Sequence, residues 1–152
     1  MWYKKCPVLL DAEIQIMCQI HPAFKLIKLN SGQVGWEGNI DVRKFVHNKI
    51  WRVLAIYDHD HPKSRSVKIY PIIPDLEKTK QSIPHTYRDH QGHLFFCTHE
   101  PGAVYHNVFN KVTSAANIIT RAALWITGYE LWQTGTISKE NFAKDNWHKT
   151  MY

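Results

Sequence analysis

The sequence predicts an α+β domain in which helices pack on one antiparallel sheet. Three observations predict it: an apolar-periodic helix near the N-terminus, four short strand-like segments separated by turns, and a long helix in the last third of the chain. Strands that follow one another directly, with helices before and after them, are typical of α+β proteins. With 152 residues, 44% of them hydrophobic, the chain is expected to form a single domain over residues 1–152 with a substantial core.

The first helix is expected from Leu9 to about Ile20, because Pro22 stops the run. Its apolar positions recur at helical spacing and are expected to face the core: Leu10, Ile14, Met17 and Cys18. Cys6, which precedes the helix, is assigned no role.

Four strand segments follow, each bounded by turn-forming residues: Phe24–Leu29, Val34–Val42, Trp51–Tyr57 and Ser66–Tyr70. Pro71 and Pro74 are expected to end regular strand pairing, because proline cannot donate a ladder hydrogen bond. Residues 83–98 are expected to be mostly loop, with one short apolar run before Cys97.

The last long helix is expected to be capped by Thr113 or Ser114, to run to about Gln133 and to end before Gly135. One stripe of apolar side chains marks the face expected to be buried: Ile118, Ala122, Trp125, Tyr129 and Trp132, with Ile119 and Ile126 beside them. Such a stripe more often belongs to a core than to a cofactor site, and the sequence predicts no cofactor.

Composition narrows the classes of partner and compartment. The net charge is +6, but the lysines and arginines are scattered, so direct binding to nucleic acid is not expected. Three cysteines without a Cys-x-x-Cys pair favour a reducing compartment. No apolar stretch approaches the ~18 residues that span a bilayer, and no signal-peptide pattern is present, so a cytoplasmic protein without a membrane partner is expected.

Cys97 is the residue most indicative of chemistry. It ends an apolar run that begins at Gly92, and His93 and His99 lie four residues before it and two after it. Because the thiolate is the reactive form of cysteine, neighbouring imidazoles suit a nucleophile. A small hydrophobic residue at the end of a strand is the alternative interpretation.

A second group of polar residues has the types that ligate metals: Asp58, His59, Asp60 and His61. They share one hairpin turn, and no other cluster is spaced to complete a closed site. The sequence therefore predicts no metal.

Three further motifs follow one another along the chain. Residues 34–40 contain a tryptophan-x-glycine, residues 69–74 a Tyr-Pro…Pro sequence, and residues 84–89 with 92–94 a histidine loop ahead of the cysteine. In this order they resemble the second strand, the fourth-strand signature and the active-site loop of the ubiquitin-conjugating (UBC) fold. That resemblance implies a UBC-like fold: N-terminal helix, four-stranded antiparallel meander, cysteine-bearing loop and long C-terminal helix.

The long helix makes the resemblance more specific, because it points to one family within this fold. It carries a specific string of residues, which are Trp125, Tyr129, Glu130, Trp132, Thr134 and Gly135. With the Pro84–Tyr87 loop and the cysteine segment, this string is similar to the prokaryotic ubiquitin-conjugating-like family. Members of that family accompany cGAS/DncV-like nucleotidyltransferases in CBASS anti-phage operons. The resemblance covers roughly residues 8–138.

The resemblance implies a transferase that forms a thioester through Cys97 with the C-terminal tail of the nucleotidyltransferase. His85 corresponds to the loop histidine of the fold, whose implied job is to hold the loop by hydrogen bonds. His99 and His93, the imidazoles nearest to Cys97 in sequence, are candidates to carry a proton for it, and a solvated loop histidine is the alternative interpretation of each. The chain is too short to hold an activating domain as well, so an activating enzyme, if one is needed, would act in trans.

Two positions depart from the pattern. The family's cysteine usually follows Gly-x-Leu directly, which here is Phe95, so Cys97 lies two residues later, on the same face of an extended segment. Tyr87 stands where the eukaryotic enzymes place an oxyanion-stabilising asparagine.

Two rival functions stay open: a catalytically inactive scaffold that binds the nucleotidyltransferase, and an unrelated cysteine hydrolase.

Overall fold

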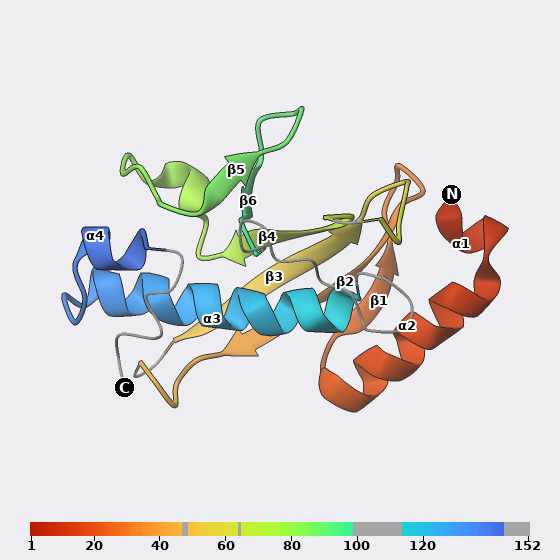
Figure 1. The fold of residues 1–152 in the computed structure, drawn as a ribbon, viewed down its shortest axis with the longest axis horizontal. Helices are drawn as coiled ribbons and strands as arrows, with labels where there is room; N and C mark the ends of the chain where they lie inside the picture. Colours follow the sequence, from red (N-terminus) through yellow and green to blue (C-terminus); the bar gives the residue numbers. More distant parts are fainter. Residues whose placement is uncertain (47–48, 64, 99–113, 145–152) are drawn as a thin grey trace.

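The chain folds as one four-stranded antiparallel sheet with helices on one of its faces (Figure 1). The computed structural model describes residues 1–46, 49–63, 65–98 and 114–144. Its elements, in chain order, are α1 (Trp2–Lys5), α2 (Pro7–Ile20), β1 (Lys25–Lys28), β2 (Val34–Asp41), β3 (Ile50–Tyr57), β4 (Val67–Ile73), the 3-10 helix η1 (Leu76–Lys78), β5 (Thr86–Arg88), β6 (Leu94–Phe96), α3 (Ala115–Gln133) and α4 (Lys139–Phe142).

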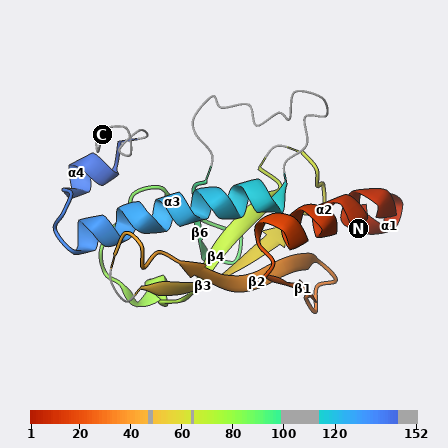
Figure 2. The ribbon, with the colours of Figure 1, turned by 90° about the horizontal axis from the view of Figure 1, so that it is seen from below.

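The sheet has the order β1-β2-β3-β4, so strands adjacent in sequence pair with each other. Alternate residues of β3 are buried, and Trp36, Ala55 and Ile69 lie opposite one another across β2, β3 and β4. Helices α3 and α2 cover this face roughly end to end (Figure 2). The predicted α+β class, the four-stranded antiparallel sheet and the long C-terminal helix are confirmed.

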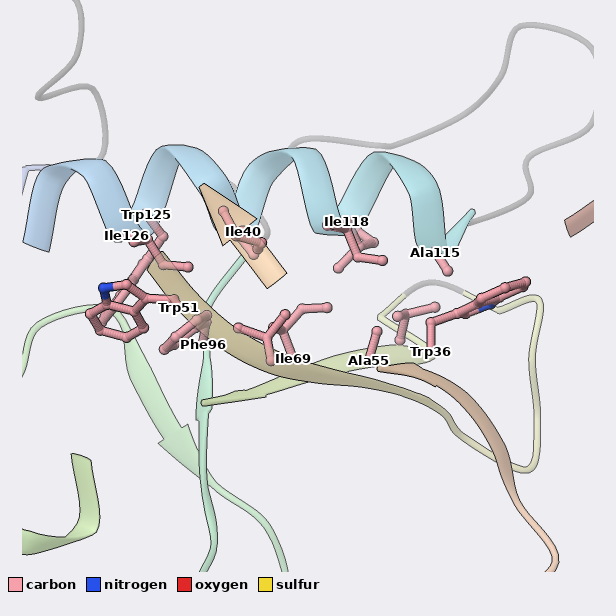
Figure 3. Packing of buried hydrophobic residues seen from close by; sticks show 14 of the residues in the cluster. Trp36, Ile40, Trp51, Ala55, Ile69, Phe96, Ala115, Ile118, Trp125 and Ile126 are labelled. Carbon is pink, nitrogen blue, oxygen red and sulfur yellow. The ribbon is translucent and has the colours of Figure 1, made fainter. Parts of the chain in front are cut away.

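The core fills the space between α3 and the sheet (Figure 3). Ile118 and Ile69 occupy its middle, while Trp51, Phe96 and Trp125 fill the end beneath the C-terminal half of α3. The predicted stripe on α3 is buried except at Trp132, which is half-buried.

Local hydrogen bonds set the ends of α3 where the sequence predicts them. The Ser114 side chain accepts from the amide of Ala116, as an N-cap does. Gly135 has φ +77, and the amides of Gly135 and Thr136 donate to the carbonyls of Trp132 and Leu131. This is the Schellman arrangement, which requires a left-handed residue just past the helix.

A buried carboxyl group joins four elements of the fold. Glu13 on α2 is 2% exposed, and its Oε2 accepts from the Tyr57 hydroxyl at 2.5 Å and from the amide of Ala115 at 2.9 Å. Trp36 donates its indole N–H to the Tyr57 oxygen. Burial raises the pKa of Glu13 above its usual value of 4.5, although these hydrogen bonds act in the opposite direction.

We expect Glu13→Gln to flatten the dependence of stability on pH above 4.5. In that range the folded carboxyl retains its proton more than the unfolded one, so wild-type stability falls as pH rises toward the folded pKa. A glutamine oxygen can still accept both hydrogen bonds but does not titrate. The measurement is the free energy of unfolding by urea between pH 4 and 8, with Asp11→Asn on the exposed face of the same helix as control. Parallel curves for wild type and Glu13→Gln would contradict the prediction.

Two expectations about the fold are wrong. Cys18 is exposed, because the buried positions of α2 are Glu13 and Met17, and the next residue turns away from them. Strand β4 continues through Pro71 to Ile73, with a register shift at β3. Proline is tolerated there because β4 is an edge strand of the sheet.

Residues 83–98 are mostly loop and turn, as expected, but they also contain the short antiparallel β5–β6 hairpin, which the sequence did not indicate. Each strand has only three residues, too few to give a periodic pattern. Among the residues that the structure describes, no helix combines the length and apolarity needed to cross a membrane.

Candidate functional site

Cys97 directly follows β6, where burial alternates residue by residue. Leu94, Phe96 and Thr98 are buried, whereas Phe95 and Cys97 are half-buried. Because alternate side chains of an extended segment share a face, Cys97 lies on the same face as Phe95, away from the core. Cys97 therefore points to the same side of the strand as Phe95, which is the position where the family's cysteine usually lies.

The hairpin brings Cys97 and His85 together through the backbone. Thr86 lies opposite Phe96, and the amide of Cys97 donates to the carbonyl of His85 at 2.7 Å, so the ladder extends one pair beyond the strands. Residues twelve apart in the chain thus form the last hydrogen-bonded pair of the hairpin.

His85 joins the cysteine segment to two helices. Its carbonyl also accepts the indole N–H of Trp125 on α3 at 3.0 Å, and its ring Nε2 lies 3.1 Å from the carbonyl oxygen of Phe142 on α4. A carbonyl can only accept, so Nε2 carries the proton in this contact. The backbone of His85 has φ +56, a left-handed conformation that few side chains adopt, and it lets the residue make all of these contacts at once.

Beneath the hairpin lies a cluster of packed aromatic rings. Trp125 stacks on Phe96 with centroids 4.0 Å apart and on Tyr129 at 5.4 Å, and Phe142 meets the edge of Trp125 at 5.6 Å. Trp51 packs against Trp125 and donates its indole N–H to the buried Glu130 at 2.7 Å. The position of the cysteine segment is therefore set by the core.

The residue after the cysteine is also anchored to α3. Thr98 is 5% exposed, and its carbonyl oxygen lies 3.4 Å from Nη1 of Arg121. Its hydroxyl has no hydrogen-bond partner among the described residues. A guanidinium group thus contacts the backbone one residue beyond Cys97.

The two other candidate histidines differ in what the structure describes. His99 lies outside the described residues. His93 lies at the opposite end of β6, where Nδ1 is 3.5 Å from Oδ2 of Asp89. Four residues of extended chain separate His93 from Cys97 by about 13 Å, so His93 does not share the site of the thiol.

An aromatic surface continues the outward face of Cys97. The Phe95 ring packs between Tyr70 at 5.8 Å and Tyr87 at 5.9 Å, and the Lys68 ammonium lies 5.6 Å from its centroid. Tyr87, at the position of the asparagine of the eukaryotic enzymes, is 58% exposed. A chain approaching Cys97 along this face would meet aromatic rings.

The residues with metal-ligand chemistry in the 58–61 turn serve packing and ion pairs. Asp58 lies 3.0 Å from Lys68, and Asp60 lies 3.7 Å from Lys63. His61 is buried against Trp2, and burial lowers its pKa to about 4. Within the described parts of the chain, no three His, Cys, Asp or Glu side chains are grouped so as to hold a metal ion.

Sequence reasoning missed Phe142, whose carbonyl binds His85 and whose side chain is fully buried. The short helix α4 that carries it starts at Ser138, whose hydroxyl accepts from the amide of Asn141. A serine followed by an acidic residue in the next turn is the one local signal that could have indicated this helix.

Comparison with known proteins gives one match. The model of the type II CBASS E2 protein family matches residues 13–138, which include the sheet, the cysteine segment and α3. No curated protein and no solved structure matches significantly. Since the matched region is most of the chain, this protein is a member of the type II CBASS E2 family, as its sequence motifs suggested.

Proposed function

We propose that this protein forms a thioester between Cys97 and the C-terminal carboxyl group of a cGAS/DncV-like nucleotidyltransferase in CBASS antiviral defence. Membership in a CBASS E2 family supports a transferase role with other CBASS proteins as partners. The observation that carries the proposal is the placement of Cys97, half-buried on the outward face at the end of β6 and fixed to the His85 loop.

The proposed reaction has two steps. First, the Cys97 thiolate attacks the carbonyl carbon of an activated C-terminus, a C–S bond forms, and the activating group leaves with its electron pair. Then an acceptor amine attacks the thioester, a C–N bond forms, the thiolate leaves, and the amine loses a proton. An activating enzyme acting in trans would supply the activated carboxyl group.

The proposed roles of the histidines differ. His85 is a positioning residue, because its ring N–H is engaged by Phe142 and its carbonyl holds the amide of Cys97. His99, two residues after the nucleophile, is the proposed proton carrier. Tyr87 stands in place of the asparagine of the eukaryotic enzymes, so stabilisation of the oxyanion would use other donors.

The test is a covalent complex on a non-reducing gel. Purified protein, nucleotidyltransferase and activating enzyme should give an adduct that thiol reductant removes. Cys97→Ser should give an oxyester that reductant does not remove, whereas Cys18→Ser, at an exposed site on α2, should behave as wild type. Co-purification of the two proteins without any adduct would instead support the scaffold.

A further inference from the structure

Among the residues that the structure describes, strand β5 has a strand partner on one edge alone. That partner is β6, which is the strand that lies beside β4 (Figure 1). The outer edge of β5 instead faces the segment that follows η1. Open strand edges are where extended peptides add to a sheet.

The alternating hydrogen bonds of the hairpin show which main-chain N–H and C=O groups of β5 point to its outer edge. Cys97 donates to the carbonyl of His85, and Asp89 donates to the carbonyl of His93. In an antiparallel ladder only alternate residues bond the same partner, so Tyr87 also faces β6. The N–H and C=O groups of Thr86 and Arg88 therefore point away from β6, and among the described residues no hydrogen bond uses them.

A cavity of about 440 Å³ adjoins this edge. All three residues of β5 line it, although their side chains alternate in direction, and its other wall includes Thr79, Gln81 and Ser82. Glu77 fixes that wall to the hairpin, because its Oε1 accepts from the amide of Leu94 and its Oε2 from the Arg88 guanidinium. Hydroxyl and amide side chains facing unpaired main-chain groups suit a polypeptide backbone as ligand.

We propose that the C-terminal segment of the protein to be conjugated binds this cavity as a third strand, antiparallel to β5. This inference rests on the thioester chemistry proposed above. Strand β5 runs away from the end of the hairpin where His85 and Cys97 meet. An antiparallel neighbour therefore ends on the Cys97 side, whereas a parallel one would end near the hairpin tip at Asp89. Only a donor tail has to present its chain end to the thiol, so the donor, not the acceptor, fits this direction.

The first experiment measures main-chain recognition. The probe is a fluorescent peptide of the last twelve residues of the nucleotidyltransferase proposed above as the thioester partner, and its binding is followed by anisotropy. N-methylation of single peptide amides should weaken binding about tenfold at every second position and little at those between, because a strand bonds β5 through alternate residues. No binding, or equal sensitivity at all positions, would overturn the proposal.

The second experiment blocks the cavity. Gln81→Trp, at an exposed position of its wall, should weaken peptide binding at least tenfold. Gln15→Trp, at an exposed position of α2, is the matched control and should bind as wild type. Unchanged binding by Gln81→Trp would place the tail elsewhere.

The third experiment tests direction. In Cys6→Ser/Cys18→Ser protein, a peptide with a thiopyridyl-activated cysteine at its C-terminal end should form a mixed disulfide with Cys97, releasing thiopyridone, faster than one activated at its N-terminal end. The opposite preference would overturn the antiparallel arrangement. These binding measurements need no acyl transfer, so peptide binding without an adduct would reject the thioester, and an adduct without peptide binding would reject the groove.

Discussion

Cys97→Ala is expected to abolish protection against phage, whereas Cys6→Ala and Cys18→Ala should retain it. If Cys97 carries the acyl group, its removal leaves no atom to form the thioester, and the loss should be complete rather than graded. Cys6 and Cys18 are exposed and lie on the helical N-terminal segment, away from the β5–β6 hairpin. The measurement is the efficiency of plaque formation on cells that carry the whole operon.

Two controls keep this result interpretable. The three variants should melt within a few degrees of wild type, because Cys97 is half-buried and the other two are exposed. Protein levels should be compared by immunoblot. Full protection by Cys97→Ala together with its loss in Cys18→Ala would refute the assignment of the nucleophile.

Trp125→Ala is expected to lower the free energy of unfolding by about 3–5 kcal/mol, the usual loss when a buried aromatic residue is truncated. The Trp125 ring stacks on Phe96 and Tyr129, and its N–H is bonded to the carbonyl of His85. Since whole domains are stable by only about 5–15 kcal/mol, the melting temperature should fall by roughly 6–20 °C. Thermal melting by circular dichroism measures the change.

The adjacent position supplies the control. Leu124 is 42% exposed on the same helix, and Leu124→Ala should change the melting temperature far less. If Trp125→Ala kept the wild-type melting temperature and lost binding to the nucleotidyltransferase, the aromatic stripe would be an interface rather than a core.

The sequence predicts well those helices and strands whose bounds are marked by residues within or next to them, such as helix caps and turn residues. The bounds of α3 follow from Ser114 at its start and Gly135 at its end, since capping is a property of a few neighbouring residues. The four strands are predicted within a few residues because turn residues separate them, and only β4 runs on, through Pro71.

The surroundings of His85 and Cys97 could not be predicted from the sequence, because they depend on contacts between distant segments. The bond from His85 to Phe142 joins residues 57 positions apart, and that from Trp125 to His85 joins residues 40 apart. The hairpin that carries Cys97 is held by such contacts rather than by strand periodicity. The expectation that Cys18 is buried failed because helical spacing alone does not choose which edge of an apolar stripe meets the core.

The single carbonyl of His85 has a consequence for the motions of the protein. It accepts both the amide of Cys97 and the indole N–H of Trp125, so the Cys97 segment and the core share one acceptor. A fluctuation that lifts the aromatic end of α3 withdraws one of these donors and loosens the turn that the other depends on. We therefore expect Cys97 to belong to the same cooperative opening unit as the core, and ligands that rigidify the core should also reduce the motion of the Cys97 segment.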